Sequence, residues 1–131
     1  MSAAKITQKL TPANEDYLEA IFELGGTKGA VRSVDLASKL DVSKASVNHA
    51  IKHLKEVGYV EQPHYGDITL TKQGAQYAAG ISERHHVLNR FLVDVLGVAP
   101  EVAAEEACTM EHAISDDTLR RLTAHLKKLL A

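Results

Sequence analysis

Hydrophobic residues recur every three to four positions over most of this chain, and that spacing predicts helices. The first such run covers residues 12–24 and is bounded by strong end signals. Thr11 can cap the helix, Pro12 suits the first helical position, and Gly25-Gly26 ends the run. The apolar positions of this helix are Tyr17, Leu18, Ile21, Phe22 and Leu24.

Two further helices are predicted close together. Ser33 opens a short one over residues 34–40, and Ser43 caps a longer one over residues 44–57, which Gly58 ends. Only the three residues 41–43 separate them. A corner of this length between two helices is typical of a helix-turn-helix.

The pattern then changes to short alternating segments. Residues 59–61 and 68–70 read as strands, and Pro63 and Gly66 supply turn chemistry between them. A helix-turn-helix followed directly by a small hairpin predicts a winged helix.

The rest of the chain reads as helix again. Thr71 caps a long run over 72–96 that Gly97 closes, Pro100 starts a helix that carries residues 105–114, and residues 115–117 cap a last one over 118–130. The predicted fold is therefore mainly α. A winged helix-turn-helix DNA-binding domain (residues 1–71) precedes an all-helical metal-binding and dimerisation domain (residues 72–131).

Composition narrows the class of protein. Hydrophobic residues make up 45% of the chain and charged residues 24%, as in a globular protein. No apolar run approaches the roughly 20 residues that span a bilayer, and the N-terminus lacks the apolar stretch of a signal peptide. With a single cysteine, no intrachain disulfide framework is possible, so we expect a cytoplasmic protein without a membrane partner.

The net charge of −2 does not favour nucleic-acid binding, but its distribution does. Residues 28–55 hold six Lys or Arg against two Asp, a local charge of about +4 over the predicted helix-turn-helix. A solvated face is the plain alternative. Because the second helix of this motif reads the major groove by its N-terminal end, we expect DNA contacts from that helix and its basic surroundings. These residues are Arg32, Ser33, Lys39, Lys44, Ala45, Ser46, Asn48, His49, Lys52, Lys55 and, on the wing, Tyr65.

Metal-ligating side chains fall into three groups. Asp16 and Glu19 stand at i, i+3, His85 and His86 lie on the long helix, and Cys108 is followed at i+3 and i+4 by Glu111 and His112. Each group also has a structural interpretation that involves no metal. The carboxylates also favour a helix N-terminus, a lone histidine is more often packed or solvated, and a lone cysteine is more often a small buried hydrophobe. The spacing of the last group is compatible with either reading.

Three separated segments, NEDYLEAIFEL, ERHHVLNRFLVDVLGV and EEACTMEHAISDDTLRRL, resemble metal-dependent repressors typified by the diphtheria toxin repressor and the manganese regulator MntR. The likeness covers residues 11–125. It implies a DNA-binding repressor of metal-uptake genes with Mn²⁺ or Fe²⁺ as co-repressor. It also implies one or two ions per subunit, held by Asp16, Glu19, His85, Cys108, Glu111 and His112.

This chain departs from both branches of the family. Cys108 stands where the manganese branch usually has glutamate, whereas Asp16 stands where the iron branch has methionine. Asn89 and Ala104 replace ligands of the iron branch's ancillary site, and 131 residues leave no room for its SH3-like domain. Since a thiolate favours softer ions, Co²⁺ or Zn²⁺ are expected to substitute in vitro.

A single recognition helix specifies few base pairs, so a homodimer on a palindromic operator is expected. Ligands drawn from both halves of the chain suggest that the ion sets the angle between them. The alternative function is a winged-helix redox sensor that switches through Cys108, although the chain has no resolving cysteine. No HExxH, GxSxG or phosphate-loop pattern occurs, so neither an enzyme nor a small organic substrate is expected.

Overall fold

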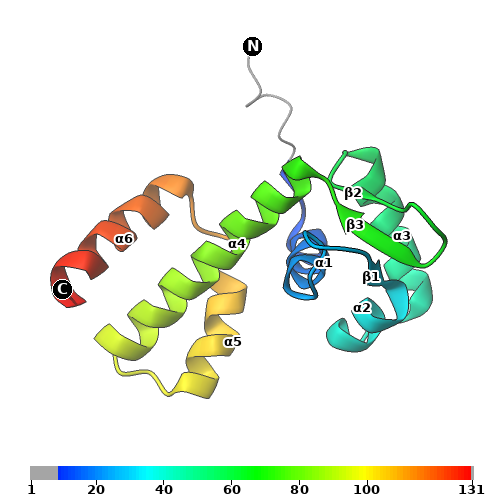
Figure 1. Cartoon of the computed structure of the whole chain (residues 1–131). Coiled ribbons are helices and arrows are strands. Elements are labelled where there is room, and N and C mark those ends of the chain that lie inside the picture. Colours follow the sequence, from blue (N-terminus) through cyan, green and yellow to red (C-terminus); the bar gives the residue numbers. More distant parts are fainter. Residues whose placement is uncertain (1–8, 131) are drawn as a thin grey trace, which may run out of the picture. The chain divides into compact units, whose positions relative to one another are not determined.

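The computed structural model describes residues 9–130 of the chain. They form two compact units that meet within the longest helix, between Ala79 and Gly80, and each unit is described by itself. The elements run in the order α1 (Pro12–Glu23), β1 (Val31–Arg32), α2 (Ser33–Leu40), α3 (Lys44–Glu56), β2 (Val60–Glu61), β3 (Asp67–Leu70), α4 (Lys72–Arg90), a π-helical turn (Phe91–Val95), α5 (Pro100–Met110) and α6 (Asp116–Leu130) (Figure 1). The mainly helical fold with a winged helix-turn-helix is confirmed.

The helix-turn-helix is α2 and α3, and its corner has an identifiable cause. Asp41 adopts a left-handed conformation (φ 54°), which ends α2 sharply. Ser43 then caps α3 by accepting a hydrogen bond from the backbone N–H of Ser46 at 3.0 Å. The inward faces of α1, α2 and α3 bury Leu18, Leu36 and Leu54 completely.

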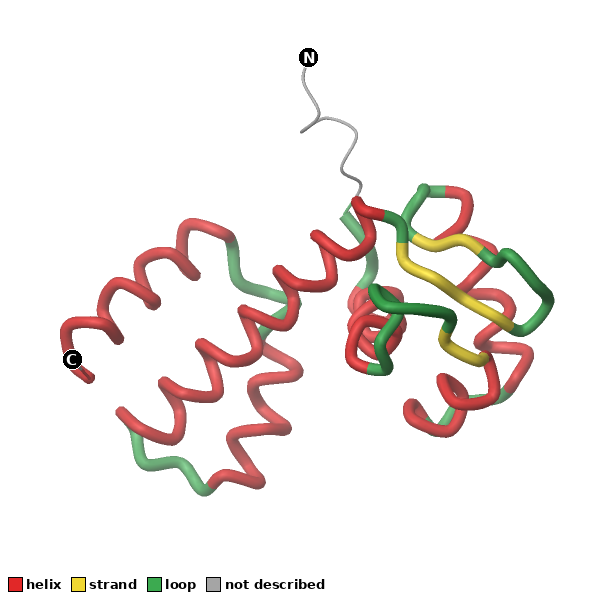
Figure 2. Tube along the Cα trace, in the orientation of Figure 1, coloured by secondary structure: helices red, strands yellow, loops and turns green. Residues whose placement is uncertain are grey.

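The wing contains one more strand than the predicted hairpin. β1 pairs antiparallel with β3, and β3 pairs antiparallel with β2, giving the sheet order β1-β3-β2 (Figure 2). Val31 stands opposite Ile68 in the register, and both side chains are buried. Both predicted strands are present as β2 and β3. The sequence analysis missed β1, because two residues carry too short an alternation to be recognised along the chain.

The start of α4 lies very close to the backbone of Gly58 and Tyr59, just before β2. The Thr71 hydroxyl donates to the Gly58 carbonyl at 2.7 Å and accepts from the Gly74 N–H at 3.0 Å, which confirms Thr71 as a cap. A Cβ on Gly74 would stand 1.9 Å from the carbonyl oxygen of Tyr59. This position therefore requires glycine.

The C-terminal unit consists of the second half of α4, the π-helical turn, α5 and α6. Its core joins Leu88 and Leu92 to the small residues Ala103 and Ala107 of α5. Among the described residues, no helix combines the length and the apolar character that a membrane span requires.

Two predicted helices of this unit differ from the structure. The run over 72–96 is not α-helical throughout, because residues 91–95 form a π-helical turn in which Leu96 N–H bonds to the Phe91 carbonyl. The helix that starts at Pro100 ends at Met110 rather than continuing to residue 114. There, Ala113 N–H bonds three residues back to Met110, and Ser115 begins the cap of α6 by accepting from Thr118 N–H. This three-residue hydrogen bond ends α5 before the cap of α6 begins.

Candidate metal centre

Three side chains of types that can bind a metal ion converge inside the C-terminal unit. His85 comes from α4, Cys108 from α5, and Glu111 from the residue that caps the end of α5. The Nδ1 atom of His85 lies 2.8 Å from Glu111 Oε1 and 3.7 Å from Cys108 Sγ. One donor atom from each side chain lies within 4.8 Å of the other two.

Helix packing explains why these residues meet. His85 shares the face of α4 that carries Leu88, three residues on, and Glu111 shares the face of α5 that carries Ala107, four residues back. The methyl side chain of Ala107 lets α5 approach α4 closely at their apolar contact. The polar cluster therefore lies at one end of the seam between the two helices.

The cluster has the electrostatics of a cation site. Glu111 is buried at 1% exposure, and a buried carboxylate requires a compensating charge and hydrogen bonds. Two imidazoles flank it: His85 Nδ1 lies 2.8 Å from Glu111 Oε1, and His112 Nε2 lies 3.7 Å from Glu111 Oε2. Imidazole nitrogen, thiolate sulfur and carboxylate oxygen together form a donor set that fits a divalent transition-metal ion.

His112 lies just past the end of α5, not within it. The expected i, i+3 relation of Cys108 and Glu111 is kept, because Glu111 N–H still bonds to the Ala107 carbonyl at 2.9 Å. The side chain of His112 is 8% exposed. Only Cys108 of this group is open to solvent.

Asp16 and Glu19 belong to the N-terminal unit and share one face of α1. Asp16 is exposed, whereas Glu19 is buried at 8% exposure. A favourable interaction with the helix dipole does not require burial. That interaction therefore does not explain why the carboxylate of Glu19 is buried.

Glu15 is a buried carboxylate that the sequence reasoning missed. It is 1% exposed, and its Oε2 accepts a hydrogen bond from the Tyr77 hydroxyl at 2.6 Å. Burial, with the hydrogen bond to Glu15 as the next cause, raises the pKa of Tyr77 above its usual range, so the phenol remains a donor. Helical spacing from Glu15 to Leu18 and Phe22 was the signal that placed it on the inward face.

The second helix of the helix-turn-helix, α3, presents its predicted DNA-contacting residues to solvent. On α3, Val47, Ala50, Ile51 and Leu54 face the core. The positions between them are exposed: Lys44, Ala45, Ser46, Asn48, His49, Lys52 and Lys55.

The other predicted DNA contacts are placed less uniformly. Arg32 is exposed on β1, Tyr65 is 87% exposed on the wing, and the ammonium of Lys39 lies 3.3 Å from the carboxylate of Glu23. Ser33 differs, because it is buried and donates both its backbone N–H (2.8 Å) and its hydroxyl (3.3 Å) to the carbonyl of Gly66. Its side chain anchors the wing turn and is not available to a phosphate.

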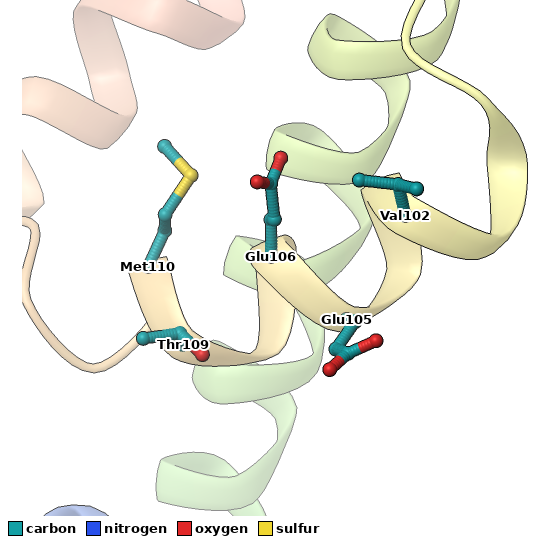
Figure 3. A pocket seen from close by; sticks show the side chains of 5 residues that line it. All are labelled: Val102, Glu105, Glu106, Thr109 and Met110. Atoms are coloured by element: carbon teal, nitrogen blue, oxygen red, sulfur yellow. The ribbon is translucent and has the colours of Figure 1, made fainter.

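The outer face of α5 carries no predicted ligand. Val102, Glu105, Glu106, Thr109 and Met110 line an open groove there (Figure 3). Val102 is 46% and Met110 37% exposed, so this unit leaves apolar surface uncovered within the chain.

Comparison with known proteins identifies both units. Residues 9–68 match the N-terminal DNA-binding domain of the iron-dependent repressors, and residues 71–130 match the metal-binding and dimerisation domain of the same proteins. An HTH-type transcriptional regulator of Methanocaldococcus jannaschii is 37% identical over 115 residues, which cover 87% of this chain and 92% of that protein. The transcriptional regulator MntR of Escherichia coli is 39% identical over 105 residues, which cover 80% of this chain and 67% of that protein.

A solved structure is similar as well. A manganese-dependent transcriptional repressor in complex with manganese superposes with a TM-score of 0.77 at 33% identity and covers 87% of this chain. The match covers 52% of that solved chain, so this chain spans about half its length. Nothing in these descriptions supports the alternative of a redox sensor. The chain belongs to the iron-dependent repressor family of metal-dependent transcriptional regulators.

Proposed function

We propose that this protein is a DNA-binding repressor activated by Mn²⁺ or Fe²⁺, and that it controls genes for metal uptake in the cytoplasm. The observation that carries the proposal is the convergence of His85, Cys108 and Glu111 in the unit that follows a basic reading helix. His112, beside Glu111, is the fourth ligand of this unit. Asp16 and Glu19 of α1 complete the set, for one or two ions per subunit.

The residues themselves explain the response to metal. Glu111 lies beside the imidazoles of His85 and His112, and imidazole and thiol side chains bind a metal in their deprotonated forms. A bound cation would add positive charge beside the buried Glu111 carboxylate. The proposed ligands include residues of α1, so we propose that metal binding is coupled to the DNA-competent state.

The coupling required is modest. A tenfold rise in operator affinity corresponds to about 1.4 kcal/mol of preferential metal binding to the DNA-competent state. The operator is a palindrome read by a homodimer, and the apolar side chains exposed in the C-terminal unit, such as Val102 and Leu96, are available for the dimer contact.

The test is an operator-binding titration under anaerobic conditions. A palindromic operator is first selected from random DNA with Mn²⁺ present. Binding is then measured by fluorescence anisotropy with Mn²⁺, Fe²⁺, Co²⁺ and Zn²⁺ in turn, alongside metal analysis of the protein. We expect chelator to remove specific binding and divalent ion to restore it. An affinity that is identical with and without chelator at physiological salt would contradict the proposal.

Ligand variants sharpen the titration. His112→Ala and Asp16→Ala are each expected to abolish the metal response while the far-UV circular dichroism remains helical. His125→Ala is the matched control, because His125 is exposed on α6 and outside the ligand set. The control is expected to respond to metal as the parent protein does.

A further inference from the structure

The hydroxyl of Tyr77 joins two parts of the N-terminal unit that are far apart in sequence. It donates to Glu15 Oε2 at 2.6 Å and accepts from the backbone N–H of Leu10 at 3.0 Å. Leu10 lies just before the cap of α1, and Glu15 lies in the first turn and a half of that helix. One phenol on α4 therefore holds both the segment that enters α1 and the beginning of the helix.

The contact is built into the core. Leu10 is 4% and Glu15 1% exposed, and the Tyr77 ring packs against the Tyr59 ring with centroids 5.2 Å apart. A phenylalanine at position 77 would fill the same space. Phenylalanine would therefore supply the packing but not the directed hydrogen bond that the hydroxyl donates to a buried carboxylate.

That bond constrains how α1 is turned about its own axis. Successive residues of a helix are separated by about 100°, so a residue four positions on lies within about 40° of the first. Anchoring Glu15 therefore also fixes the direction of Glu19, and Asp16 follows from the same rotation. Both are proposed metal ligands, whereas Glu15 and Tyr77 are not.

We propose that Tyr77 is a positioning residue, which sets the rotation of α1 on α4 through Glu15 and so orients Asp16 and Glu19 for the cation. The proposal rests on the proposed function of those two carboxylates. It gives the buried Glu15 a role in the sensitivity of the repressor to metal.

The test is Tyr77→Phe in the full chain, with Gln76→Ala as the matched control because Gln76 is exposed on the adjoining position of α4. We expect the Mn²⁺ concentration for half-maximal operator binding to rise about three- to tenfold, the range for one lost hydrogen bond. Operator affinity at saturating Mn²⁺ should stay within about twofold of the parent. The control should leave both quantities unchanged.

Variants of Glu15, the hydrogen-bond acceptor, distinguish a positioning role of the hydrogen bond from a purely structural one. Glu15→Gln keeps a carbonyl oxygen for the Tyr77 donor and is expected to retain the parent midpoint. Glu15→Leu removes the acceptor and should reproduce the shift, and adding Tyr77→Phe to it should shift the midpoint no further. These variants also answer the question if Tyr77→Phe itself fails to fold.

Two outcomes overturn the inference. A Tyr77→Phe protein with lower thermal stability but an unchanged Mn²⁺ midpoint would make the hydroxyl purely structural. A Glu15→Gln protein shifted as far as Glu15→Leu would show that the charge of Glu15, not the hydrogen bond, matters. If the parent protein itself shows no metal response, the proposed function fails instead, so the two failures are distinguishable.

Discussion

Among the proposed ligands, Cys108 is the side chain that we expect to have the greatest influence on which cation this chain prefers. Its sulfur lies 3.7 Å from His85 Nδ1, and it is the softest donor of the proposed set. Soft thiolate raises affinity for Co²⁺ and Zn²⁺ more than for Mn²⁺, which prefers oxygen ligands.

Cys108→Ser is therefore expected to discriminate among metals. The variant should lose about tenfold in affinity for Co²⁺ and Zn²⁺, or ~1.4 kcal/mol, with a smaller loss for Mn²⁺. Anaerobic metal titrations measure the affinities, and the near-ultraviolet sulfur-to-cobalt absorption reports the bond directly. Equal losses for all three ions, or no such absorption in the parent, would exclude the thiolate as a ligand.

Two exposed residues of α3 have different predicted roles on DNA. Asn48 is predicted to pair with a base edge, whereas Lys52 is predicted to contact phosphate. Asn48→Ala should cost about 1–3 kcal/mol on the operator and relax preference at one position. Lys52→Ala should weaken binding to all sequences alike and reduce the salt slope by about 1.

Anisotropy titrations on operator and scrambled DNA at several salt concentrations compare the two variants. Each variant is the control for the other, because they lie on one helix and are both exposed. If Lys52→Ala changed sequence preference while Asn48→Ala did not, the assignment of base and phosphate contacts would be reversed.

At the scale of elements, α4 contains two glycines in opposite situations. A Cβ at Gly74 would meet the Tyr59 carbonyl oxygen at 1.9 Å, whereas a Cβ at Gly80 would have no neighbour within 4 Å. The first glycine lets α4 approach the chain before the wing. The second only costs the helix stability.

Gly74→Ala is accordingly expected to lower the free energy of unfolding by about 1–3 kcal/mol, because α4 must move away from Tyr59. Gly80→Ala should raise it by about 0.5–1 kcal/mol through helix propensity. Urea unfolding of the two variants at one protein concentration measures both. A stabilising Gly74→Ala would show that α4 does not approach Tyr59 as closely in solution.

The ends of the helices show which of their features can be predicted from the sequence. Caps at Thr11, Ser43, Thr71 and Ser115 were predictable, because each depends on residues three positions away. The π-helical turn over residues 91–95 was not predictable, because local propensity does not distinguish a π-helical turn from an α-helical one.

At the scale of the whole molecule, dimerisation should make the operator's half-site spacing critical. In the proposed homodimer, one α3 helix would enter the major groove at each half-site, with the two half-sites roughly 34 Å, or one turn, apart. The family description names a dimerisation domain over residues 71–130.

Insertion of five base pairs between the half-sites is therefore expected to reduce affinity to the level of non-specific DNA, because it rotates one half-site by about half a turn. The control is a five-base-pair insertion outside the palindrome, which should have no effect. Equal affinity for both insertions, measured with saturating Mn²⁺, would indicate that each subunit binds on its own.

The sequence alone determined the succession of helices, the helix-turn-helix, the candidate donor side chains and, through resemblance, the family. These properties depend on residue type and on spacing within one or two helical turns. The predicted set of six metal ligands as a whole remains a proposal, although the structure places three of its members together.

Only the tertiary structure decided which polar side chains are buried and which donors meet. His85 and Cys108 stand 23 residues apart, and they converge because Ala103 and Ala107 pack against Leu88 and Leu92. Ser33 is withdrawn from solvent by the wing turn, and Glu15 is enclosed by a tyrosine 62 residues further on. Burial is a property of segments that are distant along the chain, and so no local pattern contains it.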